Sequence, residues 1–183
     1  MAAIRLDNVL TTLALKAGAE IMAVYDAGPV QADRKADESP VTAADLAADK
    51  VISEGLAHAY PDIPAVTEEA AESHDLTPPP HYFLVDPLDG NKEFVQLRGD
   101  FTVNIALIED GRPVMGVVLA PALGVLYAGD GSGAWRAHTE PLGARDTLSV
   151  RPAPEALKVV ASRSHLTDET RQFVERFTVD SFV

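Results

Sequence analysis

Apolar side chains recur at helical spacing over residues 5–25, and this pattern constrains the fold more than any other feature of the chain. On a helix of 3.6 residues per turn they form one continuous apolar face. Such a face is stable in water only when a second layer of structure covers it. We therefore expect a helix that ends at Gly28-Pro29 and packs on another element; its apolar positions are Leu6, Leu10, Leu13, Ala17, Ile21 and Val24.

The remaining segments supply one more long helix and a series of strands. A second helix is predicted over residues 43–59, with Thr42 as its N-cap, after a short strand and loop over residues 30–38. Asp110-Gly111 is typical of a hairpin turn between two strands. Helices followed by antiparallel strands favour a layered α/β (α+β) fold. The strands are predicted over residues 65–67, 82–86, 101–109, 113–119, 125–128 and 134–136.

A break in this pattern divides the chain into two parts. Arg151-Pro152-Ala153-Pro154 is typical of a linker, so we predict a first domain over residues 1–151 with the two helices and the antiparallel sheet. Residues 152–183 would begin a second α/β domain, with a strand over 158–161 and a helix over 167–177. A segment of about 30 residues is too short to form a core of its own.

The composition excludes several classes of protein. Apolar residues make up 46% of the chain, too many for a disordered segment, and the absence of cysteine excludes disulfides and thiolate metal sites. The formal net charge of −13 excludes a general binder of nucleic acid polymers, because phosphate contacts require a basic surface. No apolar run approaches the roughly 20 residues of a membrane span, and residues 1–7 lack a secretory signal. We therefore expect a cytoplasmic protein with no integral membrane segment.

Carboxylates lie at the ends of three predicted elements. Asp45 lies near the start of a helix, Glu68-Glu69 follows a strand, and Asp86-Pro87-Leu88-Asp89-Gly90 follows another strand. In the last segment Pro87 restricts φ and Gly90 permits a tight turn, so both aspartates can converge on one side. Each feature alone has a simpler interpretation, namely a helix cap, a solvated acidic pair and a turn. Together they favour a site for a hard cation with oxygen ligands.

Five segments, in order, resemble the inositol monophosphatase superfamily, and within it the CysQ type of 3′(2′),5′-bisphosphate nucleotidase. The resemblance covers about residues 5–170. It implies an inositol monophosphatase-like sugar phosphatase fold, in which helix and sheet layers alternate. The segments are Ser39–Asp45, Thr67–Glu69, Leu84–Phe94, Phe101–Ile108 and Ala161–His165.

Several acidic and backbone groups match functional residues of that family. The resemblance implies two or three Mg²⁺ ions, which would make an acidic pocket attractive to phosphate. Asp45 matches the carboxylate that orients and activates the attacking water, and Gly90 and Asn91 match the backbone N–H cradle for the phosphate. The implied Mg²⁺ ligands are Glu68, Asp86, the Leu88 carbonyl and Asp89.

Three further residues match segments near the site of the family. Lys35 lies where the family often has a basic residue near the metal ions; an exposed surface lysine is the alternative. Ser164 and His165 match a segment that contacts the nucleotide, and the alternative is a structural or exposed histidine after a strand.

The implied activity is Mg²⁺-dependent hydrolysis of the 3′-phosphate of adenosine 3′,5′-bisphosphate, a small phosphorylated substrate, to AMP and phosphate. Such a reaction belongs to sulfur assimilation or nucleotide recycling. Li⁺ would inhibit it, and because family members are often dimers, a homodimer is a further expectation. Two alternatives stay open: an inositol or sugar phosphate monoesterase, and a catalytically impaired protein that only binds a phosphate ligand.

The sequence departs from the family at two points. Position 91 is Asn where the family has Thr or Ser after Asp-Gly. An amide relays a proton poorly, so we expect slower turnover with substrate binding largely kept. The Trp-Asp-x-Ala-Ala segment of the family's C-terminal half is absent from the sequence, since Trp135 is followed by Arg136. We therefore expect the C-terminal part of the family's fold to be missing.

Overall fold

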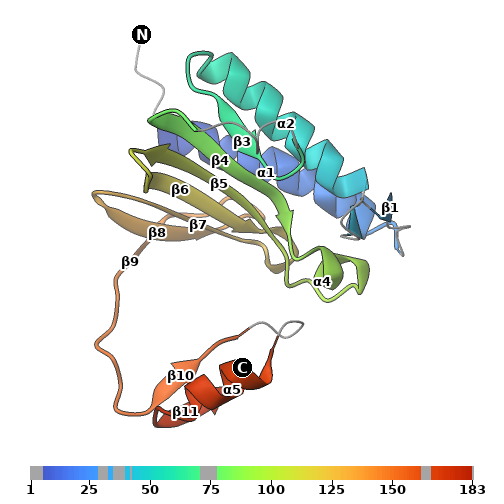
Figure 1. Cartoon of the computed structure of the whole chain (residues 1–183). Coiled ribbons are helices and arrows are strands. Elements are labelled where there is room, and N and C mark those ends of the chain that lie inside the picture. The colour runs from blue at the N-terminus through green and yellow to red at the C-terminus, as the bar shows by residue number, and fades with distance from the viewer. Residues whose placement is uncertain are drawn as a thin grey trace. The chain divides into compact units, whose positions relative to one another are not determined.

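The computed structural model describes residues 6–28, 33–34, 40–41, 43–70, 78–161 and 166–182. The chain divides into two compact units, Met1–Leu148 and Ser149–Val183. In its described part the first unit contains two long helices, α1 (Leu6–Tyr25) and α2 (Ala43–Ala59), and a seven-stranded sheet (Figure 1). Both helices occupy the segments predicted from the sequence.

The sheet is mainly antiparallel. Its strands are neighbours in sequence order from β3 to β9, and β3 and β4 are the one parallel pair among its described strands. The short helix η1 (Pro121–Leu123) joins β6 to β7. The strands are β3 (Ala65–Thr67), β4 (His81–Asp89), β5 (Thr102–Glu109), β6 (Arg112–Ala120), β7 (Val125–Asp130), β8 (Gly133–His138) and β9 (Asp146–Leu148).

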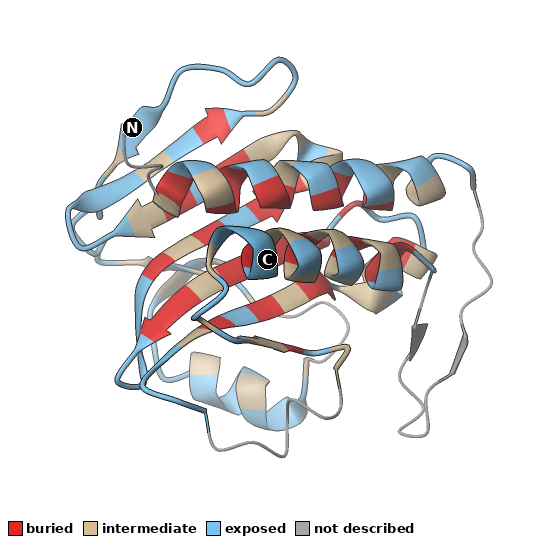
Figure 2. Cartoon of the chain, turned by 90° about the horizontal axis from the view of Figure 1, so that it is seen from above, coloured by how far each residue is buried: buried red, intermediate tan, exposed pale blue. Residues whose placement is uncertain are grey.

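One face of the sheet packs against the two helices. In Figure 2 the helices lie side by side over the strands, and buried residues recur along both. Glycine permits the closest approach: a Cβ on Gly18 of α1 would lie 2.5 Å from Leu119 Cδ2 of β6, and a Cβ on Gly55 of α2 would collide with Leu13. Each large apolar side chain in this layer stabilises the fold by about 1.5–3 kcal/mol. The fully buried residues include Leu10, Ala14, Ala17, Ile21, Ala48, Ile52, Phe83, Val103 and Leu126.

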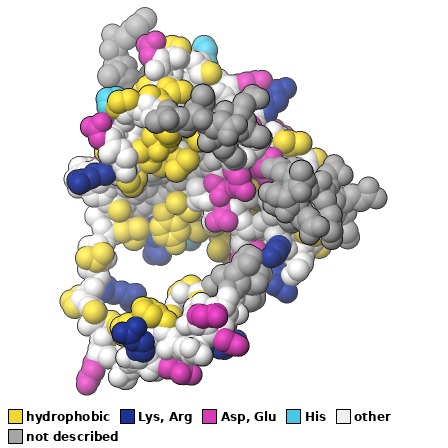
Figure 3. Space-filling model, in the orientation of Figure 1, with side chains coloured by type: hydrophobic (Ala, Val, Ile, Leu, Met, Phe, Trp, Pro, Cys, Tyr) yellow, Lys and Arg dark blue, Asp and Glu magenta, His cyan; other side chains and the backbone are white. Residues whose placement is uncertain are grey.

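The opposite face of the sheet points away from both helices, and we call it the outward face. Side chains alternate along a strand, so Leu84, Val118 and Tyr127 lie on this face, where they are 46%, 41% and 40% exposed. Figure 3 shows acidic side chains gathered beside an apolar patch on the face that it presents. Asp86 lies on the outward face as well, because it is two positions from Leu84 on β4, so this face combines apolar and acidic groups.

The second unit contains a parallel pair of strands and one helix in its described part. Thr167 caps the helix as predicted, because its hydroxyl accepts a hydrogen bond from the Thr170 backbone N–H at 3.3 Å. The predicted helix end at residue 177 is wrong: the Thr178 carbonyl already accepts a hydrogen bond from the Leu157 N–H of the strand pair, which requires an extended chain. The elements are β10 (Leu157–Val159), α5 (Asp168–Val174) and β11 (Val179–Phe182). That residues 152–183 begin a further domain stays a prediction.

The strand that holds the acidic Asp86–Gly90 segment is longer than expected. β4 continues through Asp89, so this segment is not a simple turn after a strand. The helix α4 (Asn91–Val95) follows directly, and the sequence does not predict it because five residues are too few to show helical periodicity.

Two short strands lie in the region between α1 and α2. β1 (Asp33–Arg34) pairs with β2 (Pro40–Val41) in antiparallel orientation. The predicted N-cap Thr42 lies outside the described residues. No helix in the described part of the chain is long and apolar enough to cross a membrane.

Candidate active site

A bulge in β4 brings two aspartates to the same face of the sheet. Asp86 and Asp89 are three positions apart, so in a regular strand their side chains would point to opposite faces. The register instead places Asp86 opposite Asn104 and Asp89 opposite Thr102, which are two positions apart on β5. The extra residue in β4 therefore restores a common side. Leu88, which is 1% exposed, anchors the bulge in the core.

Glu68 reaches the same place from the parallel strand. Thr67 at the end of β3 pairs with Val85, and the Glu68 N–H donates a hydrogen bond to the Val85 carbonyl at 3.2 Å. Thr67 is buried, and its Oγ1 accepts a hydrogen bond from the Ala70 N–H at 3.2 Å, which fixes the turn after the strand. Because side chains alternate, Glu68 points to the outward face beside Asp86.

The three carboxylates interact electrostatically at Asp86. Burial first, and then the negative charges of Glu68 and Asp89, raise the pKa of Asp86 to about 7. A hydrogen bond with the Glu68 side chain acts in the same direction, and one with the Leu88 backbone N–H lowers the pKa. Asp86 Oδ1 is buried and has no hydrogen-bond partner among the described residues. Such a group favours a proton or a cation.

Asp45 and Asn91 meet at a second part of the site. Asp45 lies in the first turn of α2 and is 2% exposed, where the positive end of the helix dipole favours a carboxylate. Asn91 Nδ2 lies 3.5 Å from Asp45 Oδ2, at the limit of a hydrogen bond. Asn91 Oδ1 is buried without a hydrogen-bond partner among the described residues. The amide therefore presents an acceptor next to the carboxylate.

Gly90 makes the abrupt change from β4 to α4 possible. Its φ of 96° lies in the left-handed region, and a Cβ there would lie 2.8 Å from the Asp100 carbonyl oxygen. The Phe94 N–H donates to the Gly90 carbonyl at 2.9 Å, which starts α4. The predicted need for glycine at this position is confirmed, because Gly90 allows the chain to turn from β4 directly into α4.

The structure brings some of the predicted site residues together and leaves the roles of others as predictions. Glu68, Asp86 and Asp89 share the outward face, and Asp45 lies beside Asn91. The described residues nevertheless contain no group of three or more His, Cys, Asp or Glu side chains already spaced to hold a metal ion. The ligand set, which includes a backbone carbonyl at Leu88, therefore stays a prediction. Lys35, Ser164 and His165 lie outside the described residues.

Sequence reasoning missed Thr102 and Asn104, which lie opposite the two aspartates. The signal was present in the alternation of β5, where Val103 and Ile105 are buried against the helices and the polar residues between them must face outward. Only the register with β4, which depends on the bulge, shows what these polar residues face.

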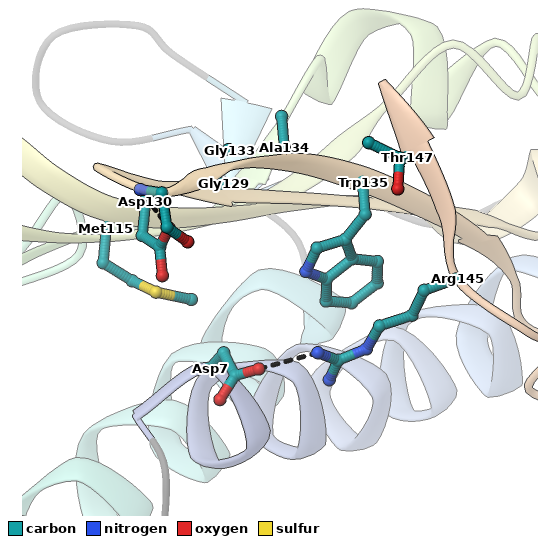
Figure 4. A pocket seen from close by; sticks show the side chains of 10 residues that line it. Asp7, Met115, Gly129, Asp130, Gly133, Ala134, Trp135, Arg145 and Thr147 are labelled. Carbon is teal, nitrogen blue, oxygen red and sulfur yellow. Dashed lines mark hydrogen bonds and ion pairs between the residues drawn. The ribbon is translucent and has the colours of Figure 1, made fainter. Parts of the chain in front are cut away.

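A pocket of about 260 Å³ lies elsewhere, between the first turn of α1 and strands β7 to β9 (Figure 4). There Arg145 Nη1 donates to Asp7 Oδ2 at 2.7 Å, and the guanidinium lies 4.0 Å from the centre of the Trp135 ring. Tyr25, at the other end of α1, contacts Phe94 beside the candidate site. At 1.5 Å per residue, about 27 Å of helix separates Asp7 from Tyr25, so this pocket is not part of the carboxylate group.

The sequence model and the relatives that match this chain all point to one protein family. The sequence model described as the inositol monophosphatase family matches residues 4–181. The 3′(2′),5′-bisphosphate nucleotidase CysQ of Salmonella typhimurium is 50% identical over 166 residues, which cover 90% of this chain and 66% of the relative. The nucleotidase of the same name from Escherichia coli O157:H7 is 47% identical over 173 residues, which cover 93% of this chain and 68% of the relative. The chain spans about two thirds of the length of these relatives.

A solved structure is similar over the same part of the chain. The crystal structure of CysQ from Bacteroides thetaiotaomicron, described as a bacterial member of the inositol monophosphatase family, has a TM-score of 0.74 at 33% identity. The similarity covers 95% of this chain and 70% of that chain. The predicted layered α/β fold is confirmed by this likeness.

Proposed function

The chain belongs to the inositol monophosphatase family, and we propose that it is a Mg²⁺-dependent phosphatase that removes the 3′-phosphate from adenosine 3′,5′-bisphosphate. The products are AMP and inorganic phosphate. Relatives that are 50% and 47% identical carry the name of this activity. The observation that carries the proposal is the outward-facing group of Glu68, Asp86 and Asp89, whose mutual repulsion a cation would relieve.

The donor set fits magnesium. All candidate ligands are oxygens, from the carboxylates of Glu68, Asp86 and Asp89 and the carbonyl of Leu88, and the buried Asp86 Oδ1 has no hydrogen-bond partner among the described residues. Bound Mg²⁺ would neutralise phosphate charge and stabilise the leaving oxygen. The protein itself contributes the bulge that aims two of these side chains at one place.

Other residues of the chain would orient the reactants. Asp45 accepts a hydrogen bond from the attacking water and takes its proton. The backbone N–H groups of Gly90 and Asn91 bind phosphate oxygens. The Asn91 amide, 3.5 Å from Asp45 Oδ2, holds the carboxylate in place but cannot pass a proton as a hydroxyl does. We therefore propose slower turnover than a threonine at this position would give. In the same proposal Ser164 and His165 contact the nucleotide, and Lys35 supplies a basic group near the metal ions.

Comparing substrates at equal concentration tests the assignment. Phosphate release from adenosine 3′,5′-bisphosphate should exceed release from inositol 1-phosphate, and added Li⁺ should suppress it. Faster hydrolysis of inositol 1-phosphate would favour the monoesterase instead. The same samples, analysed by size, would test the proposed homodimer, and fractionation of cells would test the proposed cytoplasmic location.

A second candidate function follows from Asn91. Its amide lies beside Asp45 but cannot pass a proton as a hydroxyl does, so a protein that binds a phosphate ligand without hydrolysing it is the alternative. Mg²⁺-dependent binding of adenosine 3′,5′-bisphosphate with no phosphate release would favour it.

A further inference from the structure

Three neighbouring strands place polar side chains in a row on the outward face. Glu68 follows β3, Asp86 lies on β4 and Asn104 lies directly opposite Asp86 on β5. Thr102 lies opposite Asp89 in the same register. Residues opposite each other in an antiparallel pair have Cβ atoms about 5 Å apart. Each aspartate of β4 therefore has one neutral polar neighbour on β5.

The side chains of Thr102 and Asn104 are hydrogen-bonded to each other. Thr102 Oγ1 lies 3.1 Å from Asn104 Nδ2 and 3.3 Å from Asn104 Oδ1. Both residues are half-buried, so the contact restricts the rotation of the amide. An amide nitrogen carries two hydrogens, and the contact with Thr102 uses one of them. The second hydrogen remains for a group on the opposite strand.

Asn104 makes no hydrogen bond to Asp86 in this structure; its side chain bonds to Thr102. We propose that Asn104, held by Thr102, is a positioning residue for metal binding, whose second N–H would donate to the Asp86 carboxylate when that carboxylate holds the ion. The Leu88 backbone N–H already donates to the Asp86 carboxyl group, but the buried Asp86 Oδ1 has no hydrogen-bond partner among the described residues and can accept a further bond. A neutral donor fixes the orientation of the carboxylate without adding charge, and it leaves the remaining lone pairs for the cation.

This inference rests on the proposed function, since it assigns a role toward the magnesium ion. Groups that orient a metal ligand from outside the ligand set change metal affinity about 10- to 100-fold. The inference therefore predicts an effect on metal binding itself, whether or not phosphate is hydrolysed.

The test measures Mn²⁺ binding to the full chain in the absence of substrate. The electron paramagnetic resonance signal of free Mn²⁺ reports how much of the ion remains unbound. Mn²⁺ serves as the probe because it takes the same oxygen ligands as Mg²⁺. Asn104→Ala should weaken binding about 10- to 100-fold, and Thr102→Val should weaken it by a smaller factor. Ala106→Ser is the matched control: it lies on the same strand and face but opposite Leu84, and it should bind as the wild type does.

The possible outcomes distinguish a failure of the positioning role from a failure of the proposed function. Urea unfolding in EDTA first establishes that each variant folds, and Thr102→Val keeps the test decisive if Asn104→Ala does not fold. If a folded Asn104→Ala or Thr102→Val variant binds Mn²⁺ with wild-type affinity, the positioning role is overturned and the proposed function is not affected. A wild-type protein that binds no Mn²⁺ overturns both the proposed function and this inference.

Discussion

Replacing Asp86 by asparagine should stabilise the metal-free protein at alkaline pH. The pKa of Asp86 is about 7 in the folded protein against an ordinary value of 3.8. The folded state therefore binds more protons than the unfolded state between these values, and stability falls as pH rises through this window. Above pH 7 the folded protein bears the full cost of an ionised, partly buried carboxylate. Asparagine has nearly the same shape and never carries that charge.

The size of the effect follows from the same pKa difference. Without correction it corresponds to about 4 kcal/mol at pH 8. Because solvent still reaches part of the carboxyl, screening reduces this value, and we expect Asp86→Asn to gain about 1–2 kcal/mol in free energy of unfolding. At pH 5 the folded wild type is mostly protonated at this position, so the gain should shrink to less than half.

Urea unfolding in EDTA at pH 5 and pH 8 measures both values. The exposed Asp62 provides a control, since Asp62→Asn should change the free energy of unfolding little at either pH. If Asp86→Asn is less stable than the wild type at pH 8, or gains the same amount at both pH values, the three carboxylates do not repel one another as described.

Three other predictions test separate parts of the structure. Asn91→Thr should raise kcat about tenfold or more, because a hydroxyl can pass a proton to Asp45; stopped phosphate-release assays would measure it, and an unchanged kcat would refute the relay argument. Gly90→Ala should lower the free energy of unfolding by about 1–3 kcal/mol, because φ is 96° and the added Cβ would lie 2.8 Å from a carbonyl oxygen; wild-type stability would contradict the strain. Arg145→Ala should lower the free energy of unfolding by about 1–3 kcal/mol, because it removes the 2.7 Å ion pair with the buried Asp7. It should also shift the fluorescence emission of Trp135. An unchanged free energy of unfolding would show that water replaces the guanidinium.

The sequence predicted both long helices and most of the sheet because these elements bury one face. The apolar positions of residues 5–25 became the buried face of α1, and the strands alternate as period two requires. Two short elements lacked that signal: β9 has no buried residue, and α4, although it buries Phe94, is too short to show helical periodicity.

The acidic site was predictable only in part. Asp86 and Asp89 were expected to converge through a turn, whereas they converge through a bulge inside β4, anchored by Leu88. Sequence spacing cannot distinguish these cases, because a bulge depends on the pairing with β5. For the same reason the positions of Thr102 and Asn104 opposite the aspartates could not be read from β5 alone.

The central claim is that the carboxylates of the outward face support Mg²⁺-dependent phosphate release. The most direct test measures phosphate release from adenosine 3′,5′-bisphosphate as a function of Mg²⁺ concentration, for the wild type and Asp86→Asn side by side. The account predicts release by the wild type that requires Mg²⁺, and none by the variant at any Mg²⁺ concentration. Release by the variant at the wild-type rate, or wild-type release that persists in EDTA, would contradict it.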